Sequence, residues 1–279
     1  MSRSSWYDKI QKTCHIGQTP HGREFLLQGS LLLSLLADDI YRPTKDLDLL
    51  GRGDPSPERL KAIFQEACAL DFPEDGMRFG EQLEIGFIKE GHEYPGMRLK
   101  IPAWLGLAQV TLKIDIGLGD AVLQPYEPAP FKPILLMPAP AIFAYPLESV
   151  MAEKLHAMVD LGVMTSRMKD IYDLHYLASL RPWSGLRLAE AIQLTFMRRR
   201  LALPDELPVM FTPTFFENPM KITQWKAFAG KISHASLSTM ELPAILNQLK
   251  VFWWPLLQGI KASRTFDVTW NPATNSRDP

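Results

Sequence analysis

Two aspartates, Asp46 and Asp48, are separated by one residue in the stretch TKDLDLL, and this spacing suggests metal chemistry. Side chains alternate between the two faces of a strand, so both carboxylates share one face with Arg42 and Thr44. Neighbouring carboxylates repel each other and lose hydration together, and a cation between them removes both problems. Mg²⁺ suits the pair because it binds carboxylate and phosphate oxygens. The alternative is a solvated strand face, since an isolated Asp-x-Asp pattern is short and common.

Gly29 and Ser30 stand upstream of these aspartates, directly before a run of apolar residues. Backbone N–H groups and a hydroxyl at the positive end of a helix can bind the oxygens of a phosphate. Phosphate donors followed by metal carboxylates are the two halves of a nucleoside-triphosphate site. The pair therefore favours the metal interpretation of the aspartates over the solvated face.

A third carboxylate, Asp115, lies in the middle of QVTLKIDIG, residues 109–117. Clean alternation of apolar and polar residues predicts a strand there, with Asp115 on the polar face. One interpretation is a solubility charge on an edge strand. Beside the strand with Asp46 and Asp48, however, Asp115 becomes a natural third metal ligand, while nearby Lys113 could instead neutralise the acidic cluster.

Lys154 lies on the apolar stripe of a predicted helix over residues 147–161. A lysine at such a position must either extend to water or meet an anion. The spacing of residues 166–180 predicts a second helix, on which Arg167, Asp170 and Asp173 share one face. Part of that pattern fits a surface ion pair of Asp173 with Lys169. In the other interpretation Asp170 points into a cleft, where it holds Lys154, Arg167 or a nucleotide.

The elements that must position these residues predict an α+β fold. Residues 1–145 combine a buried helix (30–38), the short strand with Asp46 and Asp48, an amphipathic helix (57–70) and three further strands (83–89, 97–101 and 109–117). A proline-rich connection over residues 122–146 marks a domain boundary near its end. The pattern is then helical over residues 146–262, and the polar residues 263–279 predict a loose tail.

Bulk composition is that of an ordinary globular protein. The chain has 279 residues, 46% hydrophobic and 22% charged, with a formal net charge of −1. We expect no signal peptide and no membrane span, because no stretch approaches the ~20 apolar residues that a bilayer requires. Cys14 and Cys68 match no metal or redox spacing, which together with the other features predicts a cytoplasmic protein.

Three blocks of sequence resemble the AbiEii/AbiGii-type nucleotidyltransferase toxins of type IV toxin–antitoxin and abortive-infection systems. The first block has the family's glycine and Ser/Thr followed by Arg-x-Ser/Thr-x-Asp-Leu-Asp. The second carries the third acidic residue before a Gly-x-Gly-Asp, and the third has a Glu-Lys helix and an Arg-x-Lys-Asp-x-x-Asp-Leu helix. They read GSLLLSLLADDIYRPTKDLDLL, LKIDIGLGD and AEKLHAMVDLGVMTSRMKDIYDL. Gln28 departs from the pattern, because many relatives have a second glycine there.

The resemblance implies a polymerase-β-like nucleotidyltransferase: a mixed sheet with helices in residues 1–145, and a helical domain in 146–262 that completes the NTP cleft. It implies transfer of a nucleotide from an NTP to an acceptor that includes tRNA 3′ ends, and a cognate antitoxin encoded nearby. Asp46 and Asp48 would hold Mg²⁺ on the NTP phosphates, and Asp115 would join them at a second Mg²⁺. The residues expected to bind NTP are Gly29, Ser30, Arg42, Thr44, Lys154, Arg167 and Asp170.

Two other functions remain open at this stage. A nucleotidyltransferase could modify a small-molecule or protein hydroxyl, which the near-neutral charge of the chain favours over RNA. The same cleft could also serve a non-catalytic NTP-binding module, although three carboxylates, Asp46, Asp48 and Asp115, argue for catalysis.

Overall fold

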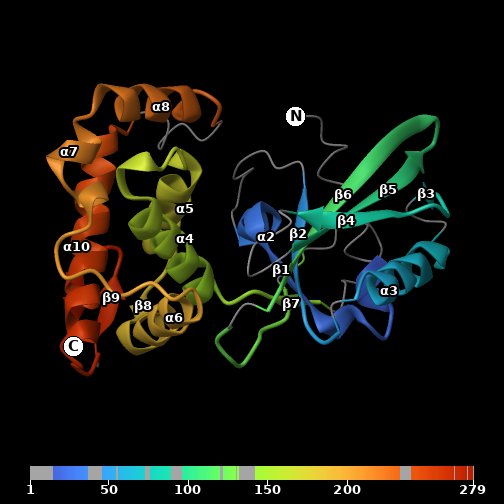
Figure 1. The fold of residues 1–279 in the computed structure, drawn as a ribbon, viewed down its shortest axis with the longest axis horizontal. Coiled ribbons are helices and arrows are strands. Elements are labelled where there is room, and N and C mark those ends of the chain that lie inside the picture. Colours follow the sequence, from blue (N-terminus) through green and yellow to red (C-terminus); the bar gives the residue numbers. More distant parts are fainter. Residues whose placement is uncertain are drawn as a thin grey trace. The chain divides into compact units, whose positions relative to one another are not determined.

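The computed structural model describes residues 15–36, 46–54, 56–72, 76–88, 96–119, 122–129, 131, 142–232, 240–266, 268–274 and 276–278. The chain divides into two compact units. Unit 1 comprises residues 1–120 and 125–145, and unit 2 comprises residues 121–124 and 146–279. A mixed sheet is the centre of unit 1, whereas unit 2 is mainly helical (Figure 1).

The sheet of unit 1 has the strand order β3-β5-β6-β2-β1-β7, with β4 also paired to β5. Its strands are β1 (Phe25–Gln28), β2 (Leu47–Gly51), β3 (Met77–Phe79), β4 (Glu84–Ile88), β5 (Gly96–Leu105), β6 (Ala108–Leu118) and β7 (Phe143–Ala144). The β2–β6 and β1–β7 pairs are parallel, and β1–β2, β3–β5, β4–β5 and β5–β6 are antiparallel. This mixed sheet, together with the helices, confirms the α+β fold class.

Two helices of unit 1 follow from local sequence signals. Helix α2 (Gly29–Leu36) consists almost entirely of apolar residues and is buried over most of its length. Helix α3 (Pro57–Ala69) begins as the sequence predicts, with Ser56 Oγ accepting a hydrogen bond from the Arg59 N–H at 3.4 Å and proline in its first turn. Its buried face consists of Leu60, Ile63, Phe64 and Ala67.

The sequence patterns predict the longer strands of the sheet but miss short ones such as β1 and β7. The predicted strands 83–89, 97–101 and 109–117 correspond to β4, β5 and β6, although β5 is longer than expected. Strands β1 and β7 have four and two residues, which is too short for alternation to be recognised. Pairing with β2 makes β1 part of the sheet, so the chain passes directly from a strand into helix α2 at Gly29.

Unit 2 is a set of helices with a small sheet. Its elements are α4 (Leu147–Leu161), α5 (Met168–Leu180), β8 (Trp183–Ser184), α6 (Gly185–Arg198), α7 (Pro213–Phe216), α8 (Pro219–Ala229), α10 (Leu242–Lys261), β9 (Thr269–Asn271) and β10 (Ser276–Asp278). Helix α4 packs on α5 and α6, and α10 packs on the same two helices. Over the described part of the chain, every helix is too short or too polar to span a bilayer.

The end of the chain differs from the loose tail expected over residues 263–279. Strand β9 pairs with both β8 and β10, so this segment completes a three-stranded sheet. Trp270 on β9 is 5% exposed, and its ring lies edge-on to Phe252 of α10 with the centroids 4.7 Å apart. The prediction of a loose tail is wrong because three-residue strands show no periodicity. The segment packs through Trp270 on Phe252 and also through Phe266 and Val268, which lie close to Gly259 and Gly185.

Candidate active site

Four polar residues form one row across the sheet of unit 1: Gln28 on β1, Asp48 on β2, Asp115 on β6 and Arg98 on β5. Each is the register partner of the next, so Gln28 lies opposite Asp48, Asp48 opposite Asp115, and Asp115 opposite Arg98. Directly opposite residues project to the same face of a sheet. This polar row therefore makes neighbours of two carboxylates that are distant in the sequence.

Alternation along the strands explains why the row is polar on one face only. Leu47 and Leu49 flank Asp48, and Ile114 and Ile116 flank Asp115; all four are at most 1% exposed. The opposite face is therefore core. Strand β6 lies between β5 and β2, so the alternative of an edge-strand charge at Asp115 is wrong.

Gly29 borders the polar row and approaches Asp48 closely. Its φ of +69° is in the left-handed region, and a Cβ at this position would lie 2.1 Å from Oδ2 of Asp48. The next residue, Ser30, is 2% exposed, and its Oγ has no hydrogen-bond partner within the described residues. Helix α2 thus begins with a glycine that lies against the Asp48 carboxylate, followed by the buried hydroxyl of Ser30.

Arg98 is the part of this site that the sequence analysis does not identify. Its guanidinium donates from Nε to Oδ1 of Asp115 at 2.7 Å and from one terminal nitrogen to Oδ2 at 2.6 Å. These hydrogen bonds raise the pKa of Arg98 above its ordinary value, and the charges of Asp46 and Asp48 raise the pKa further. The available signal is the alternation of MRLKI, which places Arg98 and Lys100 on one face of a strand.

The carboxylates only partly fit a metal site as they stand. Asp46 directly precedes β2 and, with Asp48, lies within the electrostatic reach of Arg98. Carboxylate oxygens are suitable ligands for Mg²⁺, but both oxygens of Asp115 accept hydrogen bonds from Arg98. In the described portions of the chain, no group of three or more His, Cys, Asp or Glu residues has a metal-binding arrangement. Arg42 and Thr44 lie outside the described residues.

Lys154 meets two carboxylates within unit 2. Its Nζ on α4 donates to Oδ1 of Asp170 at 2.9 Å and to Oδ2 of Asp173 at 2.6 Å, both on α5. The Lys154 side chain is 16% exposed, and those of Asp170 and Asp173 are 5% and 0% exposed. Burial disfavours the charged amine, but attraction to Asp173 and Asp170 outweighs it, so the pKa of Lys154 lies above its ordinary value.

This buried cluster decides between the alternatives for the two helices. Extension of Lys154 to water is wrong, because its amine binds anions of the neighbouring helix. Asp173 is fully buried against Lys154, so the surface ion pair suggested for it with Lys169 does not describe its environment. Arg167 lies at the edge, 46% exposed, with a guanidinium nitrogen 3.7 Å from Oδ2 of Asp170.

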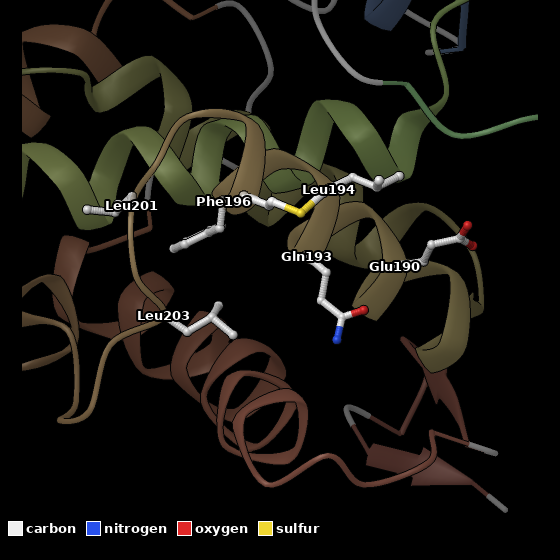
Figure 2. A pocket seen from close by; sticks show the side chains of 7 residues that line it. Glu190, Gln193, Leu194, Phe196, Leu201 and Leu203 are labelled. Atoms are coloured by element: carbon white, nitrogen blue, oxygen red, sulfur yellow. The ribbon is translucent and has the colours of Figure 1, made fainter.

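A hollow of about 500 Å³ lies elsewhere in unit 2, on α6 and the segment that follows it. Its lining is mostly apolar, as Figure 2 shows for Leu194, Phe196, Leu201 and Leu203. The predicted site residues do not line it. Because a triphosphate needs cationic or N–H donors, this hollow does not suit the chemistry that the aspartates suggest.

Comparison with solved structures finds two chains from Helicobacter pylori with a similar fold. The crystal structure of JHP933 from Helicobacter pylori is 16% identical, with a TM-score of 0.53, over 94% of this chain and 96% of that chain. A candidate nucleotidyltransferase from H. pylori is also 16% identical, with a TM-score of 0.51, over 95% of this chain and 100% of that chain. At such low identity, these similarities concern the fold. Among curated proteins, no sequence matches this chain.

The family is shown by a different comparison. The family model described as "Nucleotidyl transferase AbiEii toxin, Type IV TA system" matches residues 14–250. That range includes the polar row, the Gly29–Ser30 turn and the Lys154 cluster, and it ends within the first half of α10. This chain therefore belongs to the AbiEii family of nucleotidyltransferase toxins of type IV toxin–antitoxin systems.

Proposed function

We propose that this protein transfers a nucleoside monophosphate from an NTP to the 3′-end hydroxyl of a tRNA, with Mg²⁺ as cofactor. The observation that carries the proposal is the register of β2 and β6, which makes neighbours of Asp48 and Asp115 beside the Gly29–Ser30 turn. In the reaction, the acceptor oxygen bonds to the α-phosphorus and loses its proton to water. The bond from the α-phosphorus to the bridging oxygen breaks, and pyrophosphate leaves.

The residues proposed to hold Mg²⁺ are Asp46, Asp48 and Asp115. Their oxygens are hard donors of the kind that Mg²⁺ prefers. When bound, the metal would stabilise negative charge on the attacking and leaving oxygens. The strand register makes Asp48 and Asp115 direct neighbours, so the positions of these two carboxylates are fixed by the sheet.

Gly29 and Ser30 are proposed to bind the triphosphate. The Ser30 hydroxyl is buried without a partner among the described residues, so a phosphate oxygen would satisfy a donor that is otherwise unpaired. The amides at the start of α2 carry partial positive charge, which favours an anion at this end of the helix. Gly29 leaves room for the close approach because it has no Cβ.

For unit 2, we propose that Lys154, Arg167 and Asp170 act on the NTP. Lys154 stays charged, since its pKa is raised, and its two carboxylate partners fix the direction of its amine. Asp170 would thus orient Lys154, and the partly exposed Arg167 would supply a cation for phosphate oxygens. Arg42 and Thr44 complete the proposed set on the basis of their spacing alone.

The assay for this function is transfer of label from each α-labelled NTP to total tRNA in the presence of Mg²⁺. We expect label at the tRNA 3′ end with the natural protein, and a loss of at least about 100-fold in Asp48→Ala. Asp71→Ala is the matched control, because Asp71 is an exposed carboxylate remote in sequence from the site. Equal transfer by Asp48→Ala, or no transfer to any RNA, would contradict the proposal.

Two further results would redirect the proposal. Label on a metabolite or a protein hydroxyl, with none on RNA, would keep the transferase and change the acceptor. Stoichiometric NTP binding without release of pyrophosphate would indicate a binding module instead. The toxin role is tested separately: expression should arrest growth, and an antitoxin encoded beside this gene should relieve the arrest.

A further inference from the structure

Lys221 on α8 is a buried lysine that the proposed function does not use. The residue is 4% exposed, and its Nζ donates a hydrogen bond to the Thr165 carbonyl at 2.6 Å. The amine also lies over the ring of Phe215, 5.4 Å from the centroid. Within the described part of the chain, no carboxylate forms an ion pair with Lys221. Lysine is rarely buried without such a partner, so this position calls for an explanation.

The protein keeps this amine in place at a cost. Burial lowers the pKa of Lys221 below its ordinary value, whereas two carboxylates raise the pKa of Lys154. Methionine, an apolar side chain of similar length, would avoid the cost of burying the amine and could still pack on Phe215. Methionine could not donate a hydrogen bond to Thr165, however. The contact with this carbonyl is therefore what lysine adds at position 221.

Thr165 is held through each of its polar groups. Its N–H donates to the Gly162 carbonyl at 3.2 Å, its hydroxyl accepts from the Arg167 N–H at 3.2 Å, and its carbonyl accepts from Lys221. The residue is 1% exposed, so the hydrogen bond from Lys221 satisfies a buried carbonyl. Lys221 thus fixes the residue that contacts the backbone of Arg167.

The start of α5 depends on this contact because it lacks the usual side-chain cap. Arg167 occupies the N-cap position, and its side chain makes no capping hydrogen bond. Serine, threonine, aspartate and asparagine are preferred there, because their oxygens accept an N–H of the first turn. The Thr165 hydroxyl binds the Arg167 N–H instead, and the Asp170 N–H donates to the Arg167 carbonyl at 2.9 Å. The contacts that begin at Lys221 therefore lead to both residues of this helix start that are proposed to act on the NTP.

We propose that Lys221 is a positioning residue for NTP binding: through Thr165 it fixes the first turn of α5, and with it Arg167. The proposal rests on the function proposed above, in which Arg167 binds phosphate oxygens. The Arg167 side chain is 46% exposed, and its contact with Asp170 is long, at 3.7 Å, so this ion pair holds the guanidinium only loosely. A fixed backbone limits its freedom and reduces the entropy lost when Arg167 binds a phosphate.

The first test measures hydrogen exchange in the full-length protein without nucleotide, by mass spectrometry. We expect Lys221→Met to speed exchange at the amides of residues 165–170 by at least about fivefold, and to leave exchange in the sheet of unit 1 unchanged. Lys226→Met is the matched control, because Lys226 is an exposed lysine on the same helix, and it should exchange like the natural protein. Unchanged exchange at residues 165–170 in Lys221→Met would overturn the proposal.

The second test separates NTP binding from catalysis, with the label-transfer assay at saturating tRNA. Lys221→Met should raise the KM for NTP by about three- to tenfold and leave kcat within about twofold of the natural value, as expected for a lost contribution to binding. Arg167→Gln should raise KM at least as much. Lys221→Met added to Arg167→Gln should change KM by less than about twofold, because the two residues act together.

An unchanged KM in Lys221→Met, a loss confined to kcat, or additive effects of the two substitutions would show that Lys221 does not act through Arg167. Thr165→Val keeps the test decisive if Lys221→Met does not fold, because it removes the hydroxyl that binds the Arg167 N–H. This variant should also raise KM by about threefold or more, and should do so only while Arg167 is present.

These results are separable from failure of the proposed function. An active natural protein whose Lys221→Met variant keeps the natural KM would refute the role of Lys221 alone. Absence of label transfer by the natural protein would refute the proposed function, and this inference with it.

Discussion

At the scale of single residues, the site depends on a glycine that has no room for a side chain. Gly29 has a positive φ, and the carboxylate of Asp48 occupies the space that a Cβ would need. Any larger residue at position 29 would have two costs: the strain of a left-handed backbone and the displacement of the Asp48 carboxylate. The two can be separated experimentally, because Gly106 also has a positive φ, of +59°, but no atom within 4 Å of its Cβ position.

We predict that Gly106→Ala lowers the free energy of unfolding by about 1–2 kcal/mol, which is the penalty for a left-handed alanine. Gly29→Ala should lower it by more and should also reduce nucleotidyl transfer, because Asp48 must move. Urea unfolding and the tRNA labelling assay measure the two effects. Full transfer by Gly29→Ala would show that the position of Asp48 does not matter for activity.

At the scale of elements, the contact between α4 and α5 contains a buried ion cluster. Lys154 is the shared partner of Asp170 and Asp173, so removing it takes a cation away from two buried carboxylates, although Asp170 keeps the longer contact with Arg167. Loss of activity in a Lys154 variant could therefore reflect unfolding of this helix pair as well as loss of a phosphate contact. Stability must be measured alongside activity.

We predict that Lys154→Met lowers the free energy of unfolding by about 3–5 kcal/mol, the range for breaking a buried ion pair. Lys169→Met, an exposed lysine on α5, should change it by less than about 0.5 kcal/mol. Urea unfolding followed by circular dichroism compares the two. Equal midpoints for both variants would mean that the cluster contributes nothing to folding.

Strand β9 gives a second prediction at this scale. Trp270→Ala removes a buried ring that packs against Phe252, so we expect a loss of about 3–5 kcal/mol in the free energy of unfolding. Thr269→Ala changes an exposed neighbour on the same strand and should have little effect. Two indistinguishable unfolding curves in urea would contradict the packing of β9 on α10.

At the scale of the whole molecule, acid should weaken the protein through buried histidines. Burial lowers the pKa of His156, which packs edge-on to Phe196, and it also lowers the pKa of His175. A lowered pKa means that the unfolded chain binds protons more readily than the folded chain. Stability is therefore complete above pH 6.5, the unfolded value, and is lost as the pH falls through the lower folded value.

We predict that the free energy of unfolding falls between pH 6.5 and pH 5, by at most about 1.4 kcal/mol per pH unit for each histidine. His156→Phe should reduce this slope, because it removes one group that must take up a proton. Urea unfolding at a series of pH values gives the slopes. An identical slope in the variant would mean that His156 does not titrate differently in the two states.

Local patterns predict much of the fold, whereas long-range pairing accounts for what they miss. The polar faces of the strands with Asp48 and Asp115 follow from alternation, which depends on neighbouring residues alone. The partner of Asp115 does not, because Arg98 meets it only through the register of β5 on β6. Likewise, the position of Lys154 on an apolar stripe leaves two outcomes open, extension to water or contact with an anion. Only helix packing shows that Asp170 and Asp173 supply an anion.

The segment at residues 121–124 has a practical consequence for anyone who wishes to produce the helical unit alone. Leu123 is 1% exposed, its N–H donates to the Ser149 hydroxyl, and the Gln124 carbonyl accepts a hydrogen bond from Arg187, all within unit 2. A fragment that begins at residue 146 would lack this short stretch and leave a vacant apolar slot beside α4. A fragment designed for expression of unit 2 should therefore retain residues 121–124, for example joined by a linker to the segment that begins at residue 146.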